Sequence, residues 1–142
     1  MTQANYPEPV AGAFIINREN KLFLMKSHKW SNLWVVPGGH IEGGETIEQA
    51  LKREVQEETN MDITKPEFIC LWEFIHGKQY HDKRHMLFLN YRVGALSCTV
   101  KLNNEGQEYG WFTEEETKKL PLEQYTKMTI EQFGSQIFQK NH

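Results

Sequence analysis

The chain has 142 residues and a formal net charge of −3, with 39% hydrophobic and 25% charged residues. This length suits one domain, residues 1–142, and the composition is that of an ordinary globular protein. The charge favours neither a nucleic acid polymer nor a membrane as partner, and no apolar run is long enough to span a bilayer. The first residues lack the pattern of a signal peptide, so we expect a cytoplasmic protein.

The first part of the chain predicts short strands. Two apolar segments, 10–17 and 21–26, flank the polar loop 18–20 and are typical of paired strands. A third strand is predicted at 34–36, and the turn Pro37-Gly38-Gly39 ends it. Because glycines let a backbone approach a ligand closely, this turn is a candidate for ligand contact.

A helix is predicted directly after the glycine-rich loop. Thr46, with Gln49 three residues later, has the pattern of a capping box, which makes Thr46 the expected N-cap. Apolar residues recur at helical spacing and form one stripe, made of Ile47, Ala50, Leu51 and Val55. Asn60 follows the last helical residues, where a left-handed residue commonly ends a helix, and Asn tolerates that conformation.

The second part of the chain predicts further strands and two helices. Strands are expected at 67–76, 85–93 and 108–112, and the nearly continuous apolar character of 85–93 indicates an internal strand. A small helix starts at Thr113 and stops near Pro121, and an amphipathic helix covers 125–139. Helices that interrupt and follow a mixed sheet indicate α/β layers.

Three acidic residues of the first helix, Glu54, Glu57 and Glu58, are predicted to share one face. At about 100° per residue, Glu54 and Glu58 continue the apolar stripe. The opposite, solvent-facing side is predicted to carry Lys52, Gln56 and Thr59. Clustered like charges and unpaired buried carboxylates are both unfavourable. The cluster therefore predicts a bound hard cation, Mg²⁺ or Mn²⁺, with the Gly39 carbonyl as a further oxygen ligand.

The segment 39–61 resembles the Nudix box. It has Gly39, five residues, Glu45, seven residues, and then Arg53-Glu54-Val55-Gln56-Glu57-Glu58. It departs from the family pattern at Asn60, where Gly is usual, and Asn can take the same backbone conformation. The resemblance implies the Nudix fold, an α/β/α sandwich around a mixed β-sheet. It also implies a magnesium or manganese site formed by Gly39, Glu54, Glu57 and Glu58.

The resemblance also implies roles for residues around the metal site. A loop late in the domain often supplies a further Glu, and the candidate here is Glu105, with Glu108 as its competitor. Either Glu54 or Glu105 is expected to accept the proton of the attacking water. Glu45 and Arg53 are expected to brace the loop and the helix. Arg53 can pair with Glu57 one helical turn on, or with Glu45 across the loop.

The resemblance implies a metal-dependent pyrophosphohydrolase that cleaves a nucleoside diphosphate linked to another group. The segment 100–111 is similar to the nucleoside triphosphatase branch, which releases a nucleoside monophosphate and pyrophosphate. An ADP-ribose or sugar-nucleotide diphosphatase and a non-catalytic nucleotide-binding module remain the alternatives. Lys26 and Arg84 are candidate phosphate contacts. The expected partner is a small nucleotide, and a homodimer is compatible with the family but not required by the sequence.

Overall fold

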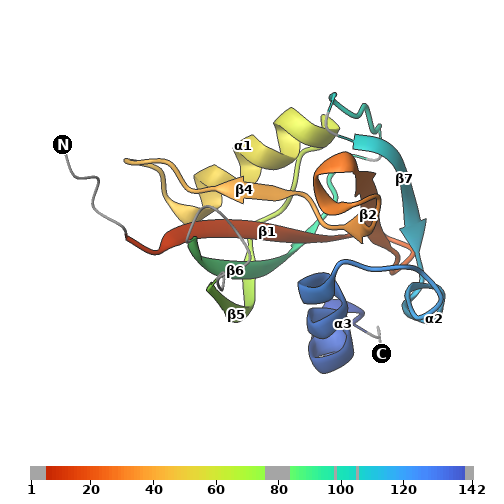
Figure 1. Ribbon diagram of the computed structural model, residues 1–142. Helices are drawn as coiled ribbons and strands as arrows, with labels where there is room; N and C mark the ends of the chain where they lie inside the picture. The colour runs from red at the N-terminus through yellow and green to blue at the C-terminus, as the bar shows by residue number, and fades with distance from the viewer. Residues whose placement is uncertain (1–5, 76–83, 98, 105, 140–142) are drawn as a thin grey trace.

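The computed structural model describes residues 6–75, 84–97, 99–104 and 106–139 (Figure 1). Its strands are β1 (Glu8–Ile16), β2 (Leu22–Ser27), β3 (Trp34–Val35), β4 (Gly38–His40), β5 (Glu67–Ile75), β6 (His85–Gly94) and β7 (Gly106–Phe112). Its helices are the 3-10 turn η1 (His28–Trp30) and the α-helices α1 (Ile47–Thr59), α2 (Glu114–Thr117) and α3 (Gln124–Ile137). The predicted strands and helices occur in the predicted order, and η1 and β4 are additional elements that were not predicted.

Within the described residues, seven strands form one mixed sheet with β1 at its centre. The order is β3-β2-β1-β6-β5, while β4 also pairs with β1, and β7 also pairs with β2. Strand β1 runs parallel to β6 along its whole length, and the other pairs are antiparallel. The internal position of β6 between β1 and β5 confirms the prediction made from its apolar sequence.

Helices cover both faces of this sheet. Successive strand residues point to opposite faces, so β1 contributes to two cores. Ala11, Ala13 and Ile15 pack with α1, whereas Phe14 and Ile16 pack with residues of α3. Figure 1 shows α1 on one side of the sheet and α3 on the other. This arrangement confirms the predicted α/β class and the α/β/α sandwich.

The ends of α1 form as the sequence predicts. The Thr46 side chain accepts a hydrogen bond from the Gln49 backbone N–H at 3.1 Å, and the Gln49 side chain accepts one from the Thr46 N–H at 2.9 Å. Both bonds satisfy N–H groups that have no partner within the helix. Asn60 ends the helix in the left-handed conformation, with φ of 65°. The family's usual Gly is therefore replaced without loss of the backbone geometry.

Two local predictions were wrong. Thr59 is fully buried rather than solvent-facing, because the segment after β6 crosses the end of α1, and the Lys101 N–H donates to the Thr59 carbonyl at 2.9 Å. The predicted turn at Gly38-Gly39 is strand β4, which pairs with β1 in the register Gly12↔Gly38 and Ala11↔Gly39. A Cβ on Gly38 would overlap the Ala11 carbonyl oxygen, so only glycine allows this close approach.

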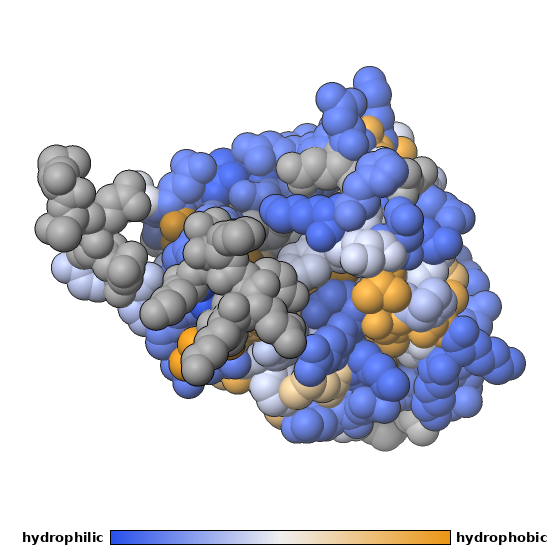
Figure 2. Space-filling model, in the orientation of Figure 1, coloured by the Kyte–Doolittle hydropathy of each residue, from blue (hydrophilic) through white to orange (hydrophobic). Residues whose placement is uncertain are grey.

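The face of the molecule in Figure 2 is mainly hydrophilic, and its hydrophobic residues are exposed in small separate areas. Scattered exposed apolar residues of this kind are normal for folded proteins. In the part of the chain that the structure describes, no helix is long and apolar enough to cross a membrane.

Candidate active site

Helix α1 presents two of its carboxylates toward the sheet. Leu51 and Val55 are fully buried in the core, and Glu54 and Glu58 continue their stripe toward the end of the helix. The Glu58 residue is only 7% exposed and the Glu54 side chain 16% exposed. The Glu57 side chain is 56% exposed and lies at the edge of this face. The three predicted acids are therefore neighbours, but only two of them point inward.

Strand β4 passes directly over these two inward carboxylates. The Gly38 N–H donates a hydrogen bond to Glu58 Oε2 at 3.0 Å. Next to it, a Cβ on Gly39 would overlap the Glu54 carboxylate, so the missing side chain makes room for Glu54. Two glycines thus bring the β4 backbone into contact with two carboxylates of α1.

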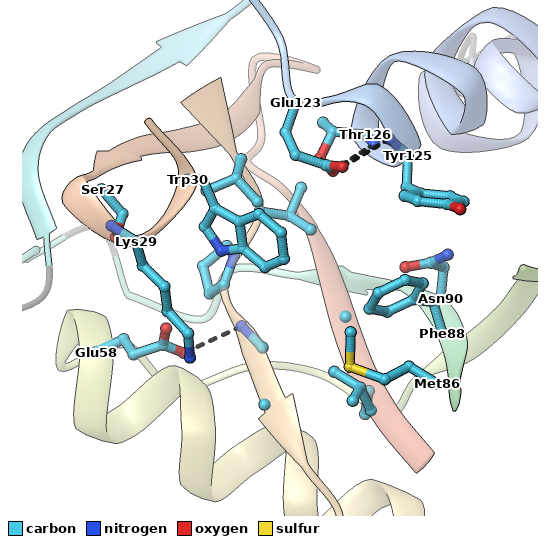
Figure 3. A pocket seen from close by; sticks show the side chains of 18 of the residues that line it. Ser27, Lys29, Trp30, Glu58, Met86, Phe88, Asn90, Glu123, Tyr125 and Thr126 are labelled. Carbon is cyan, nitrogen blue, oxygen red and sulfur yellow. Dashed lines mark hydrogen bonds between the residues drawn. The ribbon is translucent and has the colours of Figure 1, made fainter. Parts of the chain in front are cut away.

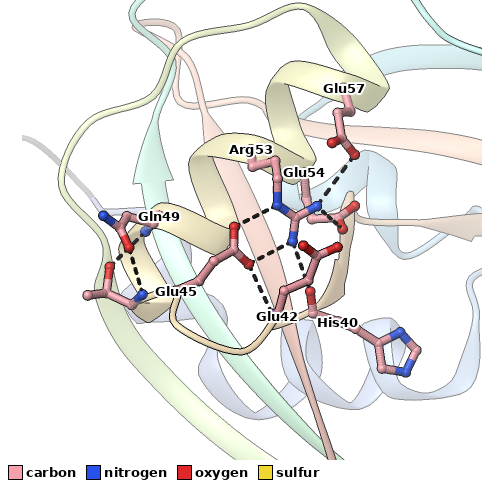
Figure 4. A network of polar contacts seen from close by, with 8 residues as sticks. His40, Glu42, Glu45, Gln49, Arg53, Glu54 and Glu57 are labelled. Atoms are coloured by element: carbon pink, nitrogen blue, oxygen red, sulfur yellow. Dashed lines mark hydrogen bonds and ion pairs between the residues drawn. The ribbon is translucent and has the colours of Figure 1, made fainter.

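Arg53 ties the loop before α1 to the helix (Figure 4). Its guanidinium donates to Glu45 from Nε at 2.6 Å and from Nη2 at 2.8 Å, which is a bidentate pair. Nη1 donates to Glu54 at 2.8 Å and lies 3.5 Å from Glu57. Nη2 also donates to the His40 carbonyl at 3.1 Å. Arg53 therefore contacts both of the partners predicted from the sequence, Glu45 and Glu57, at the same time.

The charges of this network stabilise each other. Hydrogen bonds from Arg53, and then one from the Glu42 backbone N–H, lower the pKa of Glu45 from 4.5 to about 2. The same contacts with Glu45 and Glu54 raise the pKa of Arg53 above its ordinary value. Hydrogen bonds to the charged form of a group favour that form. Arg53 and Glu45 are consequently ionised throughout the physiological range.

The donor atoms of this region suit a small hard cation. No three His, Cys, Asp or Glu side chains of the described residues form a ready-made metal cluster. Glu54, Glu58 and the β4 backbone at Gly39 instead provide a few oxygen atoms that could bind one side of an ion. Mg²⁺ is usually bound by one or two carboxylates, waters and substrate phosphates rather than by a full protein cage. The residues present therefore fit the predicted ion.

Two predictions outside the box have different outcomes. Glu105 lies outside the described residues, so its place in the site stays a prediction. Glu108, its competitor, lies on β7 with a half-exposed side chain, 3.6 Å from Lys26 Nζ. Lys26 in turn lies over the Trp34 ring, 5.2 Å from its centroid. Neither Lys26 nor Glu108 lines the cavity described next.

A cavity of about 160 Å³ lies between the Glu58 carboxylate of α1 and the start of α3 (Figure 3). Gly38, Gly39 and Glu58 form one end of its lining. The remaining wall comes mainly from β1, β2, β6, η1 and the start of α3, and its aromatic members are Phe14, Trp30, Phe88 and Tyr125. The space is thus mostly apolar with a few polar groups, as is typical of small-molecule sites.

Two exposed cationic side chains, Lys29 and Arg84, also line the cavity. Arg84 is held by Glu8, to which it donates hydrogen bonds at 2.9 and 3.2 Å. This contact is the largest cause that lowers the pKa of Glu8. Arg84 was predicted as a phosphate contact, and its position beside the cavity is compatible with that role.

Most of the cavity lining was not predicted from the sequence. Asn90 and the start of α3, with Glu123 and Tyr125, were not assigned to a site. One available signal was the polar Asn90 directly after the apolar run Met86-Leu87-Phe88-Leu89 of β6. The Glu123 carboxylate caps α3 by accepting from the Tyr125 and Thr126 N–H groups at 2.9 and 3.0 Å, so its first role is structural.

The model of the NUDIX domain matches residues 7–133 of the chain. The protein belongs to the NUDIX domain family. Over 104 residues this Nudix hydrolase is 35% identical to the nucleoside triphosphatase NudI of Escherichia coli, an alignment that covers 68% of this chain and 73% of that protein. The family membership and this relative identify the protein as an enzyme.

Solved structures share the fold of this Nudix hydrolase. A MutT Nudix hydrolase from Burkholderia pseudomallei is 24% identical, with a TM-score of 0.79 and coverage of 90% of this chain and 98% of that chain. A MutT protein from Methanosarcina mazei is 23% identical, with a TM-score of 0.77 and coverage of 94% and 98%. These similarities establish the fold that the box implied.

Proposed function

We propose that this Nudix hydrolase is a Mg²⁺- or Mn²⁺-dependent pyrophosphohydrolase that converts a nucleoside triphosphate to a monophosphate and pyrophosphate. The observation that most supports this is that two residues of the box, Gly39 and Glu58, line the cavity, together with Gly38, which donates a hydrogen bond to Glu58. A nucleoside in the cavity would have its phosphates at the carboxylates of α1. The relative named as a nucleoside triphosphatase supports the same substrate class.

In this proposal the residues of the box have different roles. Glu54, Glu58 and the Gly39 carbonyl would hold the ion, with Glu57 joining from the edge of the helix. A bound divalent ion would supply neutralisation of phosphate charge and a lowered pKa of bound water. Glu54 or Glu105 would accept the proton of the attacking water. Arg53 acts through Glu45 and Glu54 as a positioning residue.

The cavity would hold and orient the nucleoside. Its apolar lining excludes water from the base, and aromatic rings such as Phe88 and Tyr125 provide faces for contact with it. The cationic Lys29 and Arg84 would attract the polyphosphate to the cavity. Holding both ends of the substrate fixes the scissile anhydride relative to the carboxylates, which lowers the entropic part of the barrier.

A substrate screen with product identification tests this proposal. The purified protein, with Mg²⁺, is given all ribo- and deoxynucleoside triphosphates, ADP-ribose and several sugar nucleotides, and products are separated by chromatography. Monophosphate and pyrophosphate from one or more triphosphates are the expected result. Turnover of ADP-ribose or sugar nucleotides alone would replace the substrate class. Binding without turnover of any compound would favour a non-catalytic module.

A further inference from the structure

The cavity wall contains one buried amide, Asn90, whose oxygen has no donor among the described residues. Asn90 is only 7% exposed and lies in the middle of β6, next to Phe88 and Tyr125 in Figure 3. Its Nδ2 group donates to Cys70 Sγ at 3.8 Å, a weak contact. Buried polar atoms are nearly always hydrogen-bonded in folded proteins. An acceptor in this situation needs a ligand or a solvent partner.

Gly12 makes the space that this oxygen occupies. Gly12 and Asn90 are paired across the parallel strands β1 and β6. A Cβ on residue 12 would lie 2.6 Å from Asn90 Oδ1, which is closer than real side chains approach. Both residues line the cavity. The pairing therefore leaves a carbonyl-type acceptor at an apolar wall, at the opposite end from the carboxylates of α1.

We propose that Asn90 determines base specificity: its Oδ1 accepts a hydrogen bond from an N–H group on the edge of the nucleobase. This inference rests on the proposed function, because the base reaches Asn90 only if the phosphates lie at Glu54 and Glu58. Trp30 lies across the cavity from Phe88 and Met86 in Figure 3, so apolar groups would contact the base faces while Asn90 contacts its edge. A site built to hydrogen-bond a substrate N–H rejects analogues that lack it.

The two carboxylates of the wall already accept hydrogen bonds from the protein. Both Glu123 oxygens accept hydrogen bonds from the first turn of α3, from Tyr125 N–H and from the N–H and hydroxyl of Thr126. Glu58 accepts from Gly38 at the phosphate end. Asn90 is thus the described polar side chain best placed to read the base.

Steady-state kinetics of Asn90→Leu and Asn90→Asp test the inference. Two substrates are compared: the triphosphate with the highest kcat/KM in the wild type, and its analogue methylated at the N–H group of the base. Asn90→Leu should raise KM for the parent substrate about tenfold, the effect of one net hydrogen bond, with little change in kcat. It should also lose the preference for parent over analogue. Asn90→Asp keeps an acceptor and should fall between the wild type and Asn90→Leu.

Cys70→Ala is the matched control, because it removes the sulfur to which the Asn90 amide donates, and Cys70 does not line the cavity. It should leave KM and base preference unchanged. Thermal unfolding distinguishes a structural role. Replacing an unpaired buried acceptor with an apolar group of similar shape is neutral or stabilising, so Asn90→Leu should melt no lower than the wild type.

The outcomes separate the two proposals. An active wild type, together with Asn90→Leu that keeps the wild-type KM and base preference, would overturn the inference alone. A lower melting temperature of Asn90→Leu with unchanged KM would do the same and assign Asn90 to packing. A folded wild type that hydrolyses no nucleotide would overturn the proposed function and, with it, the inference.

Discussion

Arg53 and Glu45 form a bidentate ion pair across the loop between β4 and α1, with N–O distances of 2.6 and 2.8 Å. Charge-assisted fork geometry of this kind fixes orientation as well as adding energy. The same guanidinium reaches Glu54 and the His40 carbonyl. One residue thus sets the position of the glycine-rich loop relative to a carboxylate of the proposed metal site.

Arg53→Lys should impair turnover more than stability. An ammonium cannot reproduce the planar fork that engages Glu45 while it also reaches Glu54. Because partners that orient metal ligands are typically worth about 10–100-fold in activity, we expect a decrease of about that size in kcat. The measurement is steady-state kinetics at saturating Mg²⁺. Lys52→Ala, which removes an exposed cation of the same helix, is the control, and equal activity of both variants would refute the positioning role.

The Glu45 carboxylate should contribute to stability above its unfolded pKa and lose that contribution in acid. Its folded pKa is lowered from 4.5 to about 2, chiefly by Arg53. A depressed pKa stabilises the folded state above pH 4.5, and the effect disappears as the pH falls toward 2. The difference in melting temperature between wild type and Glu45→Gln should therefore shrink across this interval. A difference that does not change with pH would contradict the assignment.

Gly39→Ala should reduce activity because the new methyl group displaces the Glu54 carboxylate. Glu54 is the end of a flexible side chain and can move, so the fold should tolerate the change. A displacement of about 1 Å at a catalytic group can cost about 100-fold in rate. Gly43→Ala is the control, because a Cβ there meets no atom within 4 Å. If the two variants have the same kcat, close packing of Gly39 on Glu54 is not needed for activity.

Divalent metal should raise the melting temperature of the free protein. A ligand that binds only the native state stabilises it by about 2.7 kcal/mol at 100 times its Kd. For a domain of this size that corresponds to a shift of roughly 5–10 °C. The shift should be reduced in a Glu54→Gln, Glu58→Gln double variant. Differential scanning fluorimetry with millimolar Mg²⁺ or Mn²⁺ measures it, and no shift in the wild type would count against the metal site.

Local sequence signals were sufficient to predict α1 and its inward acids. The capping box of Thr46 and Gln49 and the left-handed Asn60 depend on neighbours in sequence, and helical periodicity placed Glu54 and Glu58 on the core side. Thr59 could not be placed in this way. It is buried by the segment that includes Lys101, which reaches the end of α1 only in the folded chain.

The cavity depends on tertiary pairing and was not predicted. Gly12 and Asn90 meet because β1 and β6 are parallel neighbours, and nothing in either local sequence specifies that pairing. Similarly, the start of α3 completes the wall from a distant part of the chain. The acidic residues of the proposed metal site were therefore predictable from one contiguous motif. The residues proposed to select the substrate were not.

The most direct test of the account measures pyrophosphate release from a nucleoside triphosphate by the wild type and by single Glu→Gln variants, with Mg²⁺. Glu54→Gln, Glu57→Gln and Glu58→Gln should each lower kcat by about 100-fold or more, since even outer partners of metal sites contribute about 10–100-fold. Glu48→Gln, an exposed acid of the same helix paired with Lys52, should have wild-type kcat. Full activity in the three box variants, with folded protein and saturating Mg²⁺, would contradict the proposed metal site.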